Sequence, residues 1–351
     1  MGRYAAWMRA IFRLDDLIVA DTFVDLDVPQ RCRFASDEVG STWLVEDLRA
    51  SQLDDDVEWQ PFVADAVGRV DAGTRVVSVD GAPVPLTRLA PGIALDDLLD
   101  AIEEVGGTAP PAATLALVGA FAAAAARNRH APWMSAPALW LGVDGRLVSL
   151  GSIRRTDMAV RRHLRSQWRY CRPEHLLTRP SFDEAGVVYV IGVVLHLLVH
   201  GCLPWAESRT QNQPMFDFML AMRAQQRSVV VADPGDPLAA LARACTAFDA
   251  AERPALDDVV ATVQQLHDRI SIEGAWLPLV AGLCPDAWRA AAAADEELGV
   301  MSAVGAVLDL PTFTSAPVDP APHLAWLRAP PPEGVFWSTR AAGPPPRALP
   351  G

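Results

Sequence analysis

One stretch of the chain, residues 187–199, is apolar at almost every position and is bounded by Gly186 and Gly201. A run of this length is too long for a typical strand and too short to cross a membrane. A helix that is apolar all round is buried in the interior of a large domain. The pattern therefore predicts a buried helix around which the rest of the protein is organised.

The apolar pattern before this helix changes along the chain. Residues 4–20 carry apolar side chains at helical spacing, which predicts a short amphipathic N-terminal helix. From residue 22 to residue 90, short runs that alternate apolar and polar residues are separated by turn residues, which predicts a sheet. Within it, the acidic start of residues 54–70 predicts one helix. The expected strands cover residues 23–28, 30–38, 42–48, 75–79 and 84–89.

After Pro91 and Gly92 the pattern becomes mainly helical. A hairpin over residues 139–150, with its turn at Asp144 and Gly145, is the exception. Further helices are expected over residues 93–105, 112–130, 216–226, 238–248 and 256–266, and in an Ala-rich segment from 274 to about 310. The chain then becomes Pro-rich, which indicates polyproline II or an unordered tail.

These patterns predict an α+β fold in five parts. The parts are an N-terminal helix (1–21), a small antiparallel sheet with one helix (22–90), a larger helical region (91–273), a helical extension (274–316) and a Pro-rich tail (317–351). With 351 residues, of which 51% are hydrophobic, the chain is long enough to bury a sizeable core.

Charge and cysteine usage exclude several classes of function. A net charge of −13 argues against general nucleic-acid binding, which needs a basic face. The chain has no lysine, so Schiff-base chemistry and a phosphate-binding lysine are excluded. Five scattered cysteines without a CxxC pair indicate reduced thiols. The first residues do not resemble a signal peptide, so we expect a cytoplasmic protein without a membrane anchor.

Three motifs in the helical region resemble those of the protein kinase family. Arg172, Pro173 and Glu174 are similar to the Ala-Pro-Glu that closes the family's activation segment. Residues 187–205, VVYVIGVVLHLLVHGCLPW, resemble the family's large-lobe helix, and Ala251-Glu252-Arg253-Pro254 matches its late Arg-Pro motif. The resemblance covers residues 22 to 270, and residues 86–102 are similar to the hinge and the first helix of the large lobe.

The resemblance implies a two-lobed protein-kinase-like fold, with the sheet as the N-lobe and the helical region as the C-lobe. It also implies a buried ion pair between Glu174 and Arg253. The positions expected to build this fold are Leu150, Gly151, Arg172, Pro173, Glu174, Val187, Gly192 and Arg253.

The catalytic positions of the family are replaced. Glu46 stands in place of the phosphate-binding lysine, with Asp65 as the counterpart of that lysine's partner carboxylate. The base, lysine and asparagine of the catalytic loop fall near Trp133, Ser135 and Ala138, and Ser149 replaces the magnesium-binding aspartate. Leu150 can fill the slot of the neighbouring phenylalanine, and Val187 replaces an aspartate of the buried helix.

The resemblance therefore implies a pseudokinase that acts as a protein-interaction, scaffold or regulatory component. Binding of ATP and magnesium is not expected, because carboxylates would repel the phosphates. The alternative is a Ser/Thr kinase-type phosphotransferase with non-standard residues. Binding of ATP and magnesium with phosphate transfer discriminates between the two, and the most informative structural observation is what fills the space between Glu46, Leu89 and Ser149.

A basic segment precedes Glu174 in this acidic chain. Its arginines suit an acidic or phosphorylated protein partner, since guanidinium groups bind carboxylates and phosphates. The other interpretation is that they pair with the chain's own acidic residues. The candidate partner-binding residues are Arg154, Arg155, Arg161, Arg162, Arg165 and Arg169.

Two further groups each have two interpretations. His196 and His200 are four residues apart on the buried helix, a spacing that suits a metal, but no third ligand accompanies them and core histidines are favoured. No metal site is therefore predicted. The aromatic residues of the extension either pack onto their own domain or anchor a partner. They are Trp276, Trp288, Trp326, Phe336 and Trp337.

Overall fold

The structure is a computed structural model of the chain. It describes residues 10–24, 31–47, 73–79, 82–127, 139–149, 173, 184–204, 235–270, 272, 274–305, 309–319 and 321. The chain divides into two compact units. Unit 1 comprises Met1–Gly92, Trp140–Arg162 and Asp286–Gly351, and unit 2 comprises Ile93–Leu139 and His163–Pro285. The predicted α+β class is confirmed, while the helices expected over 54–70 and 216–226 lie outside the described residues.

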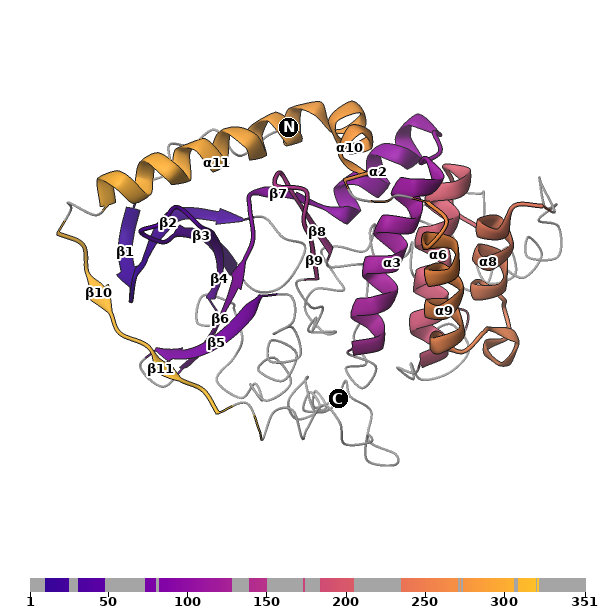
Figure 1. Ribbon diagram of the computed structural model, residues 1–351, viewed down its shortest axis with the longest axis horizontal. Coiled ribbons are helices and arrows are strands. Elements are labelled where there is room, and N and C mark those ends of the chain that lie inside the picture. Colours follow the sequence, from indigo (N-terminus) through magenta and orange to yellow (C-terminus); the bar gives the residue numbers. More distant parts are fainter. Residues whose placement is uncertain are drawn as a thin grey trace, which may run out of the picture. The chain divides into compact units, whose positions relative to one another are not determined.

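Unit 1 is built on a curled sheet of eight strands in the order β10-β1-β2-β3-β4-β6-β5-β11 (Figure 1). Its six long strands are antiparallel to one another. They are β1 (Ala10–Leu14), β2 (Leu17–Val24), β3 (Arg31–Ser36), β4 (Thr42–Asp47), β5 (Thr74–Val79) and β6 (Ala82–Arg88). The strands expected from residue 30 to residue 89 are therefore confirmed within one or two residues of their ends.

The predicted N-terminal helix over residues 4–20 is wrong wherever the structure describes this part of the chain. Strands β1 and β2 form a hairpin there, joined at Asp15 and Asp16, with Asp15 in the left-handed conformation at φ 53°. All four residues from Leu17 to Ala20 are buried, so both faces of β2 are covered. Burial on both faces removes the alternation of apolar and polar residues that normally identifies a strand. The apolar residues of this segment then also match helical spacing by coincidence.

A C-terminal segment joins the two edges of this sheet. Strand β10 (Thr312–Phe313) pairs in parallel with β1, and strand β11 (Ala316–Pro317) pairs antiparallel with β5. Only two residues separate β10 from β11, so this short segment bridges the edge formed by β1 and the edge formed by β5. The extension predicted as helical over 274–316 is thus helical only in its first part. Pairing of both edges protects them from other chains.

Helix α11 (Pro285–Gly305) belongs to unit 1 from Asp286 onward. The Ser302 hydroxyl donates a hydrogen bond of 2.7 Å to the backbone carbonyl of Asp37, at the turn between β3 and β4. Ala294, Leu298 and Met301 are buried along the same helix. This hydrogen bond holds α11 against the β3–β4 turn of the same unit.

Unit 2 is helical and is centred on α6 (Glu184–His200). Every residue of α6 from Gly186 to Leu198 is buried, which confirms the predicted central helix. It packs against four other helices of this unit (Figure 1). They are α2 (Leu95–Val105), α3 (Pro111–Arg127), α8 (Pro237–Cys245) and α9 (Leu256–His267). The shorter elements are η3 (Ala250–Glu252) and α10 (Leu277–Leu283).

Gly192 lies where α6 approaches the end of α8. A Cβ atom placed on Gly192 would lie 2.6 Å from the Cβ of Cys245 and 2.8 Å from the Cγ2 of Thr246. Both distances are shorter than carbon atoms tolerate, and both partners are buried. A side chain at this position would force the two helices apart.

We predict that Gly192→Ala lowers the free energy of unfolding by about 2–3 kcal/mol, because overpacking a tight core costs this much. Urea denaturation followed by circular dichroism measures the change. Gly119→Ala on α3 is the matched control, because its Cβ would meet only the Cγ1 of Val263, at 3.5 Å. Since alanine favours a helix over glycine by about 1 kcal/mol, the control should be neutral or stabilising. Equal losses in both variants would contradict the argument.

Candidate functional site

Glu46 stands on β4, the strand between β3 and β6. It is 2% exposed and lies opposite Cys32 of β3 in the strand register, while its neighbour Val45 joins the interior apolar cluster. The alternation along β4 thus places Glu46 and Leu44 on the face opposite to Val45. A carboxylate is enclosed at the position that the resemblance gives to a phosphate-binding lysine.

The segment at residues 89–92 follows β6 and is held on two sides. The Leu89 amide donates to the carbonyl of Thr42 at 3.1 Å, which ties the segment to the start of β4. The Val143 amide donates to the carbonyl of Pro91 at 2.8 Å. At Gly92 a Cβ atom would collide with the carbonyl oxygen of Leu141, so only glycine fits. These contacts fix the backbone of residues 89–92 beside β4 and the segment at residues 141–143.

The hairpin of β8 (Leu139–Gly142) and β9 (Leu147–Ser149) carries Trp140, which packs beside the segment at residues 89–92. Trp140 is 1% exposed, and its indole N–H donates a hydrogen bond of 2.9 Å to the carbonyl of Ala90. Its ring is tilted against Phe34 of β3, with centroids 6.2 Å apart. Phe34 is itself opposite Leu44 in the register of β3 and β4. A buried indole therefore lies between the strand face that carries Glu46 and the carbonyl of Ala90.

The turn of the hairpin is the one expected at Asp144 and Gly145. The Gly142 amide donates to the carbonyl of Arg146 at 2.9 Å, and Gly145 has a φ of 85°. The hairpin prediction is confirmed. Sequence reasoning did not single out Trp140, although a tryptophan inside a short apolar strand was a signal that a large ring is enclosed there.

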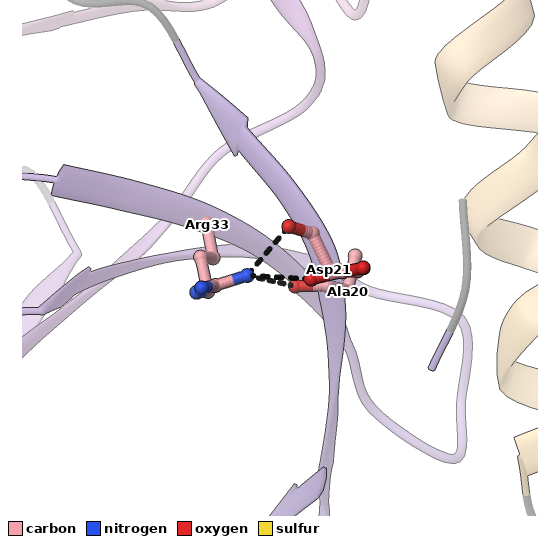
Figure 2. A network of polar contacts seen from close by, with 3 residues as sticks. All are labelled: Ala20, Asp21 and Arg33. Carbon is pink, nitrogen blue, oxygen red and sulfur yellow. Dashed lines mark hydrogen bonds and ion pairs between the residues drawn. The ribbon is translucent and has the colours of Figure 1, made fainter. Parts of the chain in front are cut away.

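Arg33 is a second residue that sequence reasoning missed. Its Nη1 lies 3.3 Å from the carbonyl oxygen of Ala20, 2.5 Å from that of Asp21 and 3.4 Å from the Asp21 carboxylate, as Figure 2 shows. The β2–β3 register shifts between Val19 and Phe23, next to these carbonyls. The guanidinium therefore binds carbonyls at an irregular point of the sheet. The position of Arg33 opposite the core residue Val45 follows from the strand register, so the sequence alone offered no signal for it.

Arg253 is buried after η3 and holds the helical unit together. Its Nε donates to the carbonyl of Ala247 at 2.8 Å, its Nη1 to that of Ala185 at 3.0 Å, and its Nη2 to that of Phe248 at 3.3 Å. Its guanidinium carbon lies 4.7 Å from the ring centre of Tyr189 on α6. The expected partner Glu174 lies outside the described residues, so that ion pair stays a prediction.

The other predicted positions are placed as follows. Ser149 ends β9, Pro173 and Val187 are buried, and Gly192 lies at the contact of α6 and α8. Outside the described residues lie Asp65, Trp133, Ser135, Ala138, Leu150, Gly151, Arg172, Glu174 and the six candidate partner-binding arginines, Arg154, Arg155, Arg161, Arg162, Arg165 and Arg169.

The two histidines of α6 are neighbours, with ring centres 4.5 Å apart. His196 Nδ1 lies 2.8 Å from the carbonyl oxygen of Cys202. Burial lowers the pKa of His196 to about 4, so its ring is neutral near pH 7. Within the described part of the chain, no group of three or more His, Cys, Asp or Glu side chains is arranged to hold a metal ion.

Comparison with known proteins adds no assignment: the sequence matches no protein-family model, and it matches no curated protein. Among the described residues, no helix combines the length and the apolar character needed to cross a membrane.

Proposed function

We propose that this chain is a catalytically inactive protein-kinase-like module, with residues 22–90 as its N-lobe and residues 91–273 as its C-lobe, that acts as a protein-interaction, scaffold or regulatory component. The order of elements supports the proposal. The strand with Glu46 is followed by β6, the segment at 89–92, α2, the β8–β9 hairpin and the buried α6. This is the order in which the resemblance places the lysine strand, the hinge, the first helix of the large lobe and the later motifs.

The observation that carries the proposal is the place of Trp140. Its indole is a planar bicyclic ring, and its N–H is bonded to the carbonyl of Ala90 in the hinge-like segment. A nucleobase bound at this segment would compete with the indole for the same carbonyl and the same space beside Phe34. Close packing prevents two rings from sharing one enclosed volume.

The residue at the lysine position also argues against nucleotide binding. Glu46 is a carboxylate at the position where the family uses a lysine to bind phosphates, and it lies on a buried strand position. A carboxyl group gives a triphosphate no positive charge, so the contact that the lysine makes in the family is lost here. The proposal therefore includes no nucleotide or magnesium cofactor.

The thermal melting of the full-length protein, with and without ATP and magnesium, tests this function. We expect the melting temperature to stay the same, whereas a ligand at 100 times its dissociation constant would add about 2.7 kcal/mol of stability. A clear rise, together with transfer of labelled phosphate to the protein or a substrate, would instead support the alternative of a Ser/Thr phosphotransferase with non-standard residues.

The kind of partner is inferred from the charges in the amino-acid sequence. The arginines from residue 154 to residue 169 contrast with a chain of net charge −13, and arginine forks bind carboxylates and phosphates in a bidentate way. An acidic or phosphorylated protein is therefore the proposed partner.

A further inference from the structure

The last turns of α6 carry two imidazoles on one side of the helix. His196 and His200 are one helical turn apart, and their ring centres lie within 4.5 Å of each other. Residues at this spacing can direct two side chains to a single metal ion. His196 is buried and His200 is half-buried, so the pair reaches from the core of unit 2 toward its surface.

The hydrogen bond of His196 sets its tautomer. The carbonyl oxygen of Cys202 can only accept, so Nδ1 of His196 carries the proton and donates it at 2.8 Å. The lone pair of the neutral ring is then on Nε2. Metal-binding histidines commonly donate their other ring N–H to a backbone carbonyl in this way, which orients the ring and makes it a better ligand.

The pair lies at the C-terminal end of α6, close to the end of a second helix. Gly201 ends α6 and approaches Gly107, which follows the end of α2. Two helix C-termini therefore meet beside the histidines, and each presents backbone carbonyls with partial negative charge.

We propose that His196, through Nε2, and His200 together bind a divalent transition metal such as Zn²⁺ or Ni²⁺, with water completing the coordination. Imidazole nitrogen suits these ions and does not suit Mg²⁺ or Ca²⁺. Among the described residues, no third His, Cys, Asp or Glu side chain joins the pair. The inference is independent of the proposed function.

The test is titration of the full-length protein with Zn²⁺ in competition with a chromophoric chelator at pH 7.5. We expect His200→Ala and His196→Ala each to weaken the binding at this site at least tenfold. His267→Ala is the matched control, because His267 lies at the end of α9 and bonds Gln264, and its loss should leave the affinity unchanged. Circular dichroism melting with a chelator present verifies that each variant is folded.

Thermal melting gives a second readout, which can be measured even when a variant is less stable than the wild type. Zn²⁺ should raise the melting temperature of the wild-type protein and of Cys202→Ser, and should not raise that of His200→Ala. An affinity that is unchanged in both histidine variants, or no saturable binding by the wild type, would overturn the proposal. Loss of binding in Cys202→Ser would also overturn it, since the site would then be a thiolate site.

Discussion

Replacement of Arg253 by methionine should lower the free energy of unfolding by about 3–5 kcal/mol, because three hydrogen bonds from its guanidinium are lost. The guanidinium binds the carbonyls of Ala185, Ala247 and Phe248, which belong to two distant parts of the chain. Methionine fills a similar volume but donates no hydrogen bond. Three carbonyls at this part-buried place would lose a donor, and each buried polar group left without a partner costs about 1–3 kcal/mol.

Urea denaturation of Arg253→Met against the wild type measures this effect. Arg243→Met is the matched control, because Arg243 is exposed on α8 and its replacement should change stability by less than about 0.5 kcal/mol. Arg253→Lys should fall between the two, since a lysine keeps the charge but lacks the planar fork that reaches three carbonyls. A loss for Arg253→Met no larger than that of the control would show that these bonds do not stabilise unit 2.

Replacement of Trp140 by alanine should also cost about 3–5 kcal/mol, which is typical of removing a buried tryptophan. The change removes the ring beside Phe34 and the hydrogen bond to Ala90, and it leaves a cavity shaped like the indole. A cavity with one carbonyl acceptor should bind free indole. We therefore expect millimolar indole to raise the melting temperature of Trp140→Ala and to leave that of the wild type unchanged.

Trp43→Ala is the control for this experiment. Trp43 is half-buried, donates to the Asp37 carboxylate at 3.0 Å and lies beneath the guanidinium of Arg75, so its removal leaves an open surface and not a cavity. Indole should not stabilise this variant. If indole fails to stabilise Trp140→Ala as well, the enclosed ring site that supports the proposed function is not present. Stabilisation of Trp140→Ala by ATP would identify Trp140 as the group that excludes nucleotide.

The helical unit could be predicted from local pattern to a large extent. The apolar run that forms α6 has apolar residues on all sides, so it had to lie in a core. The helix end predicted from the glycines after residue 105 is also observed, since Gly106 adopts the left-handed conformation that ends α2. The hairpin turn at Asp144 and Gly145 has the composition that such turns require. These features depend on residues close in sequence, so the sequence alone contains the information.

The N-terminal strands and the candidate site could not be predicted in the same way. Whether Ile18 belongs to a helix or to a strand is decided by the pairing of β2 with β1 and β3 and by the burial of both faces of β2, which only the folded sheet provides. The position of Trp140 against Ala90 depends on how the β8–β9 hairpin packs on the segment after β6. No local pattern encodes such contacts.

The sequence by itself therefore determined that a buried helix organises a large helical region and that the chain carries no lysine. Only the tertiary structure decided that an indole occupies the region beside the strand of Glu46, and that a short C-terminal segment joins both edges of the sheet. The physical reason is the range of the interactions. Periodicity and turn composition reflect bonds within a few residues, whereas the burial of a ring depends on which distant segments the whole fold brings together.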